Sequence, residues 1–187
     1  MRKISTIFER NWETDRKVNA QLIVDFDFEH AVATEKLDGT NIRVTVRNGI
    51  VVRSEKRRNP SKQQKQAGIV DPWYVDINEH SPEDKWMMAA INSTDFSAVP
   101  DGEWPAEALG KNIQGNPLQL EGNQVFIFSL PDWRERILLT DAPHTFSELR
   151  EYLNTKKSCI GNDCLMEGVV WHHPDGSMVK IKRKDFK

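Results

Sequence analysis

The chain has 187 residues, of which 38% are hydrophobic and 29% are charged, and its formal net charge is −2. This length suits one domain with a sizeable core, and the composition excludes a disordered chain. The first residues, MRKISTIFERNWETD, hold no long apolar segment, and no later apolar run approaches about 18 residues. We therefore expect a cytoplasmic globular protein that forms one domain over residues 1–187 and makes no contact with membranes.

The charges are unevenly distributed along the chain. Six basic residues and one acid lie between Arg53 and Lys65, whereas nine acids and only Lys85 lie between Asp71 and Glu107. A second basic run ends the chain and contains Lys180, Lys182, Arg183, Lys184 and Lys187. The basic runs are candidates for phosphate binding, and the alternative for each is an ordinary solvated surface.

The two cysteines, Cys159 and Cys164, are separated by four residues. A chain with its own core needs no disulfide, so we expect free thiols. A zinc site with His172 and His173 is the alternative, but CIGNDC lacks the two-residue spacing that is usual between zinc ligands.

The first half of the chain is rich in strand signals. Residues 21–39 (QLIVDFDFEHAVATEKLDG) mix β-branched and aromatic residues and end in a turn at Gly39. Alternating apolar and polar residues on both sides of Asn48-Gly49 predict a two-stranded hairpin over residues 41–56. The polar, proline-containing segment 59–82 predicts a long surface loop.

A helix is expected over residues 82–92 (PEDKWMMAAIN), with a buried face formed by Trp86, Met87, Ala90 and Ile91. The following segment 101–117 (DGEWPAEALGKNIQGNP) predicts a turn at each glycine and an apolar interior. Residues 124–130 (QVFIFSL) then predict a strand.

The last quarter of the chain predicts a helix followed by a hairpin. In residues 144–155 (HTFSELREYLNT), Thr145 and Glu148 have the spacing of a capping box. Residues 164–186 read as strand, turn at 174–176, and strand. Hairpins at both ends with helices between them predict an α+β fold of antiparallel sheets with flanking helices.

Lys36, at the end of a predicted strand, is a candidate nucleophile. The pKa of a lysine is about 10.4, but burial and neighbouring cations lower it. Lys180 and Lys182 could supply such cations because their i, i+2 spacing places both amines on one face of a strand. Two lysines on one inward face require an anion, and a triphosphate meets that requirement. A solvated edge strand is the alternative for both.

Two carboxylates and two aromatic rings fit the same chemistry. Glu167, just before the Val169–Trp171 run, could hold a divalent metal ion or neutralise the lysines, and Glu107 could accept hydrogen bonds from ribose hydroxyls. Phe126 and Phe128 alternate along one strand, so a ring could stack on a purine. The alternative for these rings is a place in the core.

These residues occur in the order of a known set of motifs. KLDG at 36–39, EALG at 107–110, VFIFSL at 125–130, EGVV at 167–170 and VKIK at 179–182 resemble motifs I, III, IIIa, IV and V of the covalent nucleotidyltransferases. This superfamily includes polynucleotide ligases and mRNA capping enzymes. EKLDGTN, KNIQGNP and EGVVWHHPDGSMVKIKR are most similar to ATP-dependent RNA ligases of the compact 5′–3′ type. The resemblance implies a nucleotidyltransferase (ATP-grasp-like) adenylation domain, and we expect no OB domain after Lys182.

The resemblance also implies roles for the phosphate-binding residues. Lys36 would attack the α-phosphate of ATP to form lysyl-AMP and release pyrophosphate. Lys180 and Lys182 would hold the phosphates, and Glu167 would help to bind the metal. Magnesium is the expected ion, with manganese as the alternative, because carboxylate and phosphate oxygens are hard ligands.

Further roles follow for residues around the nucleoside and the RNA. Glu35 would lie near the adenine, Glu107 would hold the ribose, and Phe128 would cover the base, with Phe126 in reserve. Arg53 would contact the nucleotide or an RNA 5′-phosphate, and Asn41 would assist sealing. The expected partner is RNA with 5′-phosphate and 3′-hydroxyl ends, bound in part by the basic run 53–65.

Two positions depart from the motifs, with Ala106 where glycine is common and Ser129 where aspartate is frequent. The alternatives to an RNA ligase are a DNA ligase or capping-type core and a non-catalytic binder of nucleotide or RNA.

Overall fold

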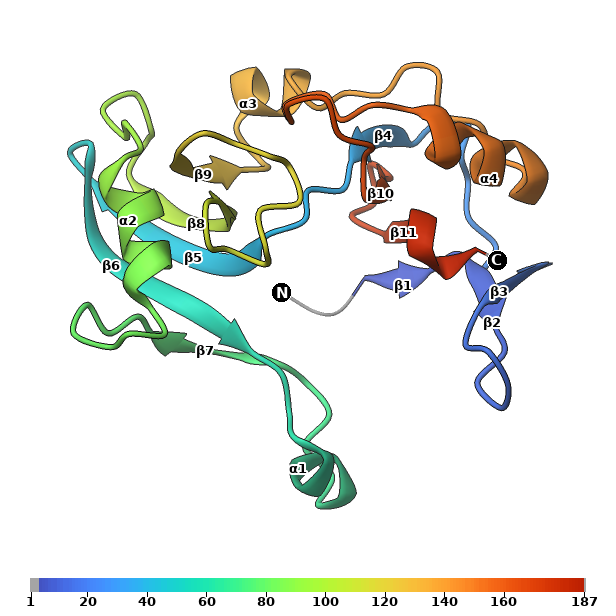
Figure 1. The fold of residues 1–187 in the computed structure, drawn as a ribbon, viewed down its shortest axis with the longest axis horizontal. Coiled ribbons are helices and arrows are strands. Elements are labelled where there is room, and N and C mark those ends of the chain that lie inside the picture. The colour runs from blue at the N-terminus through green and yellow to red at the C-terminus, as the bar shows by residue number, and fades with distance from the viewer. Residues whose placement is uncertain (1–3, 187) are drawn as a thin grey trace. The chain divides into compact units, whose positions relative to one another are not determined.

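The computed structural model describes residues 4–186, which form two compact units (Figure 1). Residues 38–133 form one of them, which we call unit 1. Residues 4–37 and 134–186 form the other, unit 2. The chain therefore enters unit 1 directly after Leu37 and leaves it after Trp133. Lys187, the last member of the C-terminal basic run, lies outside the described residues.

Unit 1 is built on a five-stranded sheet with the order β7-β6-β5-β8-β9, and all neighbouring strands are antiparallel. Its strands are β5 (Thr40–Arg47), β6 (Ile50–Arg58), β7 (Trp73–Asp76), β8 (Gly102–Gly110) and β9 (Asn123–Ile127).

The predicted hairpin is confirmed as β5 and β6. Asn48 and Gly49 join the two strands with positive φ angles of 51° and 73°, the backbone conformation that this turn requires. Along β5, the residues at alternate positions Ile42, Val44 and Val46 are fully buried. One face of the sheet is therefore apolar, and the other carries the polar side chains.

Helix α2 (Lys85–Asn92) contributes to the core of unit 1, as the sequence predicts. Met87, Ala90 and Ile91 are buried in the same cluster as the apolar residues of β5, whereas Trp86 is only partly buried against it. The helical spacing of these residues therefore identified the packing face correctly.

Three sequence expectations for unit 1 differ from the structure. Residues 59–82, expected as a loop, contain β7 and the helix α1 (Lys62–Gln66), which begins at a capping box of Ser61 and Gln64. Segment 101–117 contains the nine-residue strand β8, whose first and last residues are glycines, so these glycines bound a strand instead of interrupting it. β9 ends at Ile127, before Phe128, and the short helix α3 (Pro131–Glu135) follows.

Unit 2 contains a four-stranded sheet with the order β1-β11-β10-β4 and a separate antiparallel pair, β2 and β3. β1 runs parallel to β11, and the other neighbours are antiparallel. The strands are β1 (Ser5–Thr6), β2 (Phe8–Arg10), β3 (Val18–Leu22), β4 (Val32–Glu35), β10 (Gly168–His172) and β11 (Met178–Lys182). The expectation was an α+β fold of antiparallel sheets with flanking helices. The structure has antiparallel sheets with few helices, and one parallel pair is added.

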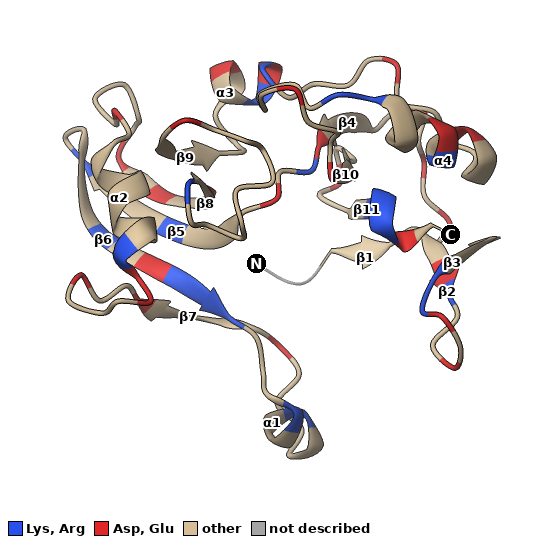
Figure 2. Cartoon of the chain, in the orientation of Figure 1, with Lys and Arg blue, Asp and Glu red and all other residues tan. Residues whose placement is uncertain are grey.

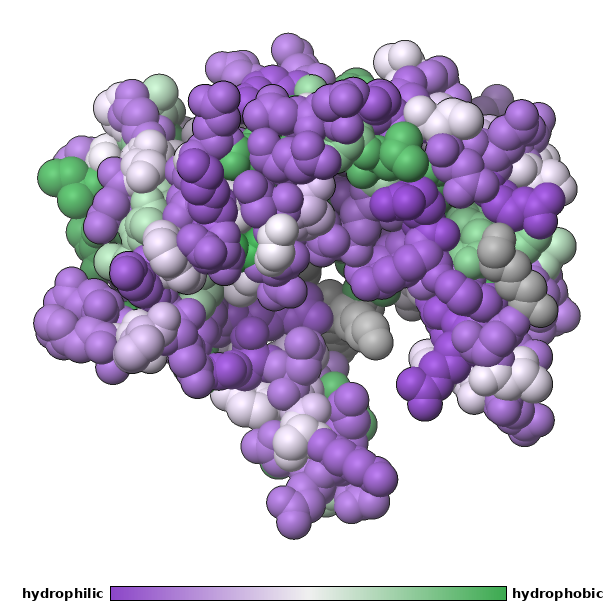
Figure 3. Space-filling view, viewed as in Figure 1, coloured by the Kyte–Doolittle hydropathy of each residue, from purple (hydrophilic) through white to green (hydrophobic). Residues whose placement is uncertain are grey.

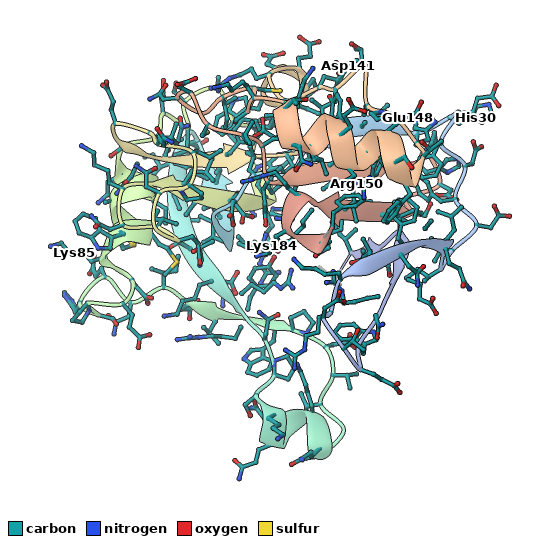
Figure 4. All side chains as sticks on the ribbon, turned by 45° about the vertical axis from the view of Figure 1, so that its right-hand side comes forward. His30, Lys85, Asp141, Glu148, Arg150 and Lys184 are labelled. Carbon is teal, nitrogen blue, oxygen red and sulfur yellow. The ribbon has the colours of Figure 1, made fainter. Side chains whose placement is uncertain are left out.

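Helix α4 (Phe146–Thr155) covers the core of unit 2. Its Leu149 and Leu153 are fully buried in a cluster that includes Trp171 and Ile181 of the β10–β11 hairpin. Thr145 caps this helix, because its Oγ1 accepts the Glu148 N–H. The Glu148 carboxylate accepts from the Thr145 hydroxyl at 2.6 Å, whereas in the expected capping box it would accept from the Thr145 backbone N–H. Glu148 and Arg150 lie on this helix, as Figure 4 shows.

A 3₁₀ turn, η1 (Arg183–Asp185), follows β11. Among residues 4–186, no helix has the length and apolarity needed to cross a bilayer. Cys159 and Cys164 are free thiols, as expected. The same part of the chain holds no group of three or more His, Cys, Asp or Glu residues arranged to bind a metal ion.

Candidate active site

Lys36 lies where β4 leaves the sheet of unit 2. Its backbone N–H donates to Gly168 O at 2.8 Å, so the contact between β4 and β10 continues one residue beyond the strand. A Cβ at Gly168 would lie 2.1 Å from Ile181 O, so the glycine of EGVV is required by close packing against β11. The backbone at the base of the Lys36 side chain is therefore fixed by two other strands.

Glu167 joins Lys36 and Lys182 in one ionic cluster. Its Oε2 accepts from Lys36 Nζ at 2.5 Å, and its Oε1 accepts from Lys182 Nζ at 2.6 Å. The side chain of Glu167 is 8% exposed, and those of Lys36 and Lys182 are 19% and 22% exposed. Two ammonium groups and one carboxylate leave this partly buried cluster with one net positive charge, which suits an anionic ligand.

The last strand presents both of its lysines on one face. Lys180 and Lys182 are partly exposed, whereas the residue before each of them, Val179 and Ile181, is buried in the core. The i, i+2 spacing of VKIK therefore places both lysine side chains on one face of the strand, as the sequence predicts.

Glu35 lies on the other face of the sheet from Lys36, because consecutive residues of an extended chain point in opposite directions. The residue is 1% exposed, and its carboxylate accepts from Ser158 Oγ and Cys159 N–H, both at 2.6 Å. Burial raises the pKa of Glu35, and these hydrogen bonds oppose that rise. Within unit 2, Glu35 connects β4 to the loop after α4, and no local sequence pattern signals its partner Ser158.

In unit 1, three of the expected residues share the polar face of the sheet. Asn41 of β5 pairs with Glu107 of β8. Thr45, further along β5, pairs with Arg53 of β6. Asn41 and Thr45 alternate with the buried residues Ile42 and Val44 of β5, and Glu107 and Arg53 are their cross-strand partners, so all three expected residues lie on the face away from the core. Asn41 and Glu107 are partly exposed, and Arg53 is exposed.

A hydrogen-bonded network fixes the Asn41 side chain. Its Nδ2 donates to Ala106 O at 3.2 Å, and its Oδ1 accepts from Tyr74 Oη at 2.9 Å. Arg43 lies over the Tyr74 ring, 4.6 Å from its centroid, and makes two hydrogen bonds of 2.7 and 2.9 Å to Glu55. Burial is the main cause that raises the pKa of the Tyr74 hydroxyl.

Sequence reasoning missed Arg43, Glu55 and Tyr74. Alternation in NIRVTVR could have placed Arg43 on the same face as Asn41. The position of Tyr74 could not have been found in that way, because it depends on the pairing of β7 with β6.

Arg53 makes two ion pairs, with Asp76 at 2.9 Å and with Glu55 at 3.1 Å. The hydrogen bond to Asp76 raises the pKa of the Arg53 guanidinium. Any phosphate that bound Arg53 would therefore compete with two carboxylates.

The two candidate rings differ in exposure. Phe126 is 1% exposed and packs against Phe128 and Trp133, with ring centroids 5.9 and 5.7 Å apart. Phe128 follows β9 and is partly exposed. Phe128 therefore retains ring surface for a ligand, and Phe126 fills the interior.

The basic residues of the run 53–65 differ in burial: one forms an ion pair in the interior, and others are exposed on the surface. Lys56 is buried and forms an ion pair with Asp84, so it belongs to the interior of unit 1. Lys62 and Lys65 of α1 are exposed. Figure 2 shows the basic residues as blue segments along β6 and on α1.

No protein-family model matches the chain, and a search of curated proteins finds no match. Among solved structures, the chain is similar to RNA ligase from Naegleria gruberi. A variant with ATP and manganese has 16% identity and a TM-score of 0.47, with 82% of this chain and 50% of that chain covered. The same ligase with pyrophosphate has 16% identity and a TM-score of 0.46, covering 82% and 49%. Another variant, with AMP and manganese, has 14% identity and a TM-score of 0.48, covering 98% and 62%. The chain therefore spans less than two thirds of the length of these ligases.

Proposed function

We propose that the chain is an ATP-dependent RNA ligase in which Lys36 is the adenylated nucleophile. The observation that carries the proposal is the meeting of Lys36, Glu167 and Lys182 at one carboxylate, although they come from three separate segments of the sequence. The five ordered motifs place the same residues at the positions that carry this chemistry in the nucleotidyltransferases.

In the first step, Lys36 Nζ attacks the α-phosphorus of ATP. A phosphorus–nitrogen bond forms, the bond from the α-phosphorus to the bridging oxygen breaks, and pyrophosphate leaves with that oxygen. The amine must lose a proton to attack, and Glu167 Oε2, at 2.5 Å, is positioned to accept it. Lys182 and Lys180 stabilise the negative charge on the phosphates as it shifts toward the leaving group.

A divalent cation fits this cluster only as an ion shared with phosphate. Glu167 is the carboxylate of the cluster, and both of its oxygens already accept from lysines. Glu167 would hold Mg²⁺ or Mn²⁺ together with the phosphates of the nucleotide, because carboxylate and phosphate oxygens are hard ligands. When bound, the ion would neutralise charge on the phosphates.

We assign recognition of the nucleoside to unit 1. Glu107 would accept from the ribose hydroxyls, Phe128 would stack on the adenine, and Arg53 would contact phosphate. Glu35, also proposed to act near the adenine, could do so only through the loop at Ser158 and Cys159 that its carboxylate holds. On this proposal, residues 1–187 act together as one cytoplasmic adenylation domain.

Two later steps complete the cycle. AMP passes from Lys36 to an RNA 5′-phosphate, and a 3′-hydroxyl then attacks that phosphate, forms the phosphodiester and releases AMP. Asn41 would assist sealing, and the exposed residues of the basic run would bind RNA.

Incubation with radiolabelled ATP or GTP, followed by denaturing electrophoresis, tests the first step. We expect a covalent AMP label that Lys36→Ala abolishes and that Lys85→Ala, on α2, leaves in place. A label from GTP alone would indicate a capping-type enzyme, and the absence of any label would indicate a binding protein. The adenylated chain is then offered 5′-phosphorylated RNA and DNA, and sealing of DNA alone would overturn the assignment to RNA.

A further inference from the structure

Unit 1 has a groove along the first half of β6. It has a volume of about 800 Å³. It is lined by residues 49–54, by the last residue of β7 and the loop after it (76–80), and by the end of α2 with residues 94–96. Arg53 is the single residue of the candidate active site among its lining residues. The groove therefore belongs mostly to a part of unit 1 that the proposed chemistry does not use.

The edge of the sheet is uncovered along this groove. β7 pairs with β6 only at residues 55–58, and the last contact is the hydrogen bond from Ile77 N–H to Ser54 O. Within residues 4–186, no strand pairs with the outer side of Ile50 to Arg53. An edge of this kind offers backbone donors and acceptors to an added strand.

Apolar side chains accompany this edge. Ile50 and Val52 are 66% and 60% exposed, a large fraction for β-branched residues on a strand. Figure 3 shows hydrophobic (green) atoms at the end of unit 1 where the β5–β6 hairpin lies. Deeper in the groove, Met88, Ile91 and Phe96 supply an apolar wall. An extended segment with alternating side chains would meet backbone on one side and apolar surface beneath it.

The charged groups in the groove are mostly acidic. Asp76, Glu79 and Asp95 line it, against Arg53 as the one Lys or Arg among its described lining residues. Because Arg53 is already paired with Asp76 and Glu55, the carboxylates left to a ligand are Asp95 and Glu79, the latter 3.6 Å from His80 Nε2. Asp95 accepts the Ser97 N–H, and that hydrogen bond lowers the pKa of its carboxyl group, which therefore stays ionised at neutral pH.

We propose that the groove binds a basic, extended segment of a partner protein, which adds as a strand to the free edge of β6 at Ile50 to Arg53. Its apolar side chains contact the wall formed by Met88, Ile91 and Phe96, and its Lys or Arg side chains pair with Glu79 and Asp95. The carboxylates disfavour RNA in the same groove, because they repel phosphate.

The test uses the full chain and labelled peptides that alternate valine with lysine or valine with glutamate. We expect fluorescence anisotropy to show that the lysine peptide binds at least about tenfold more tightly, with the advantage reduced by salt. N-methylation of alternate peptide amides should abolish binding, and the bound peptide should slow hydrogen exchange at Val51 to Arg53.

The double variant Glu79→Gln with Asp95→Asn removes both charges and keeps an oxygen that can accept the Ser97 N–H. The double variant should bind the lysine peptide about tenfold or more weakly than the unchanged chain does. Glu121→Gln, which changes an exposed carboxylate elsewhere in unit 1, should leave the affinity unchanged. AMP labelling by the double variant confirms that it is folded. Equal binding of both peptides, an unaffected double variant, or self-association of the chain through this edge without peptide binding would each overturn the proposal.

Discussion

The chemistry proposed for the chain depends on a few side chains, and Glu167 is the most informative of them. It is shared by two lysines, so it could either accept a proton from Lys36 or only balance the charge of the pair. Replacing it by glutamine keeps the size and the hydrogen-bonding oxygen but removes the charge. We expect Glu167→Gln to reduce the rate of AMP labelling by about 100-fold or more.

Glu148→Gln is the matched control, because this carboxylate belongs to the cap of α4. It should label at the rate of the unchanged chain. A glutamine at position 167 that left labelling unchanged would show that the carboxylate has no role in the reaction.

His172 gives the stability of the chain a pH dependence. Its Nε2 lies 3.0 Å from Thr34 Oγ1, and burial, with a smaller effect of Arg134, lowers its pKa to about 4. Between pH 4 and about 6.5 the unfolded chain binds a proton here that the folded chain does not, so stability is present above this window and is lost as pH falls. We expect the free energy of unfolding to fall by about 1 to 2 kcal/mol from pH 7 to pH 5 through this residue.

Urea unfolding at both pH values measures this loss. His172→Gln should remove that part of the decline, whereas His80→Gln, whose side chain is 87% exposed, should keep it. The same decline in both variants would contradict the assignment to His172.

At the scale of elements, a buried ion pair connects β6 to the segment before α2. Asp84 is 1% exposed and accepts from Lys56 Nζ and, at 2.9 Å, from Asn78 N–H. Asp84→Ala would leave an ammonium group and an amide without their partner in the interior. We expect a loss of about 3 to 5 kcal/mol in the free energy of unfolding, measured with urea and tryptophan fluorescence.

The neighbouring Glu83 provides the control for this pair. Its side chain is 73% exposed and lies 3.7 Å from Lys56, so Glu83→Ala should cost no more than about 1 kcal/mol. Equal losses in the two variants would show that burial does not distinguish these carboxylates.

Elements with a local signal were predictable from the sequence, and those that depend on distant partners were not. Asn48-Gly49 determined the β5–β6 hairpin, and Thr145 determined the start of α4. β7 was missed because the four residues Trp73–Asp76 have a strand partner only in β6. Segment 101–117 was misjudged for a related reason, since its glycines bound β8.

At the scale of the whole molecule, the candidate site was also predictable where a local pattern signals it and not where it depends on distant partners. Spacing alone predicted that Lys180 and Lys182 share a face, and the order of the motifs identified Lys36 and Glu167, which form one ionic cluster with Lys182. Glu35 and Ser158, which are hydrogen-bonded to each other, lie 123 positions apart in the sequence. No pattern within either segment predicts this contact. Tertiary pairing therefore determines which of the conspicuous polar residues face a ligand and which support the sheet.

The binding of RNA, if it uses the arm formed by β6 and α1, must depend on salt. Lys62 and Lys65 are exposed on α1, and each contact with a phosphate of single-stranded RNA releases about 0.7 of a counterion. Replacing both by glutamine should therefore lower the slope of log affinity against log salt by about 1.4, with affinity lost equally for all sequences. Titrating labelled 5′-phosphorylated RNA without ATP at several salt concentrations measures the slope. Lys85→Gln with Lys157→Gln removes two positive charges outside the arm, and an equal change in its slope would mean that net charge, and not the arm, governs RNA binding.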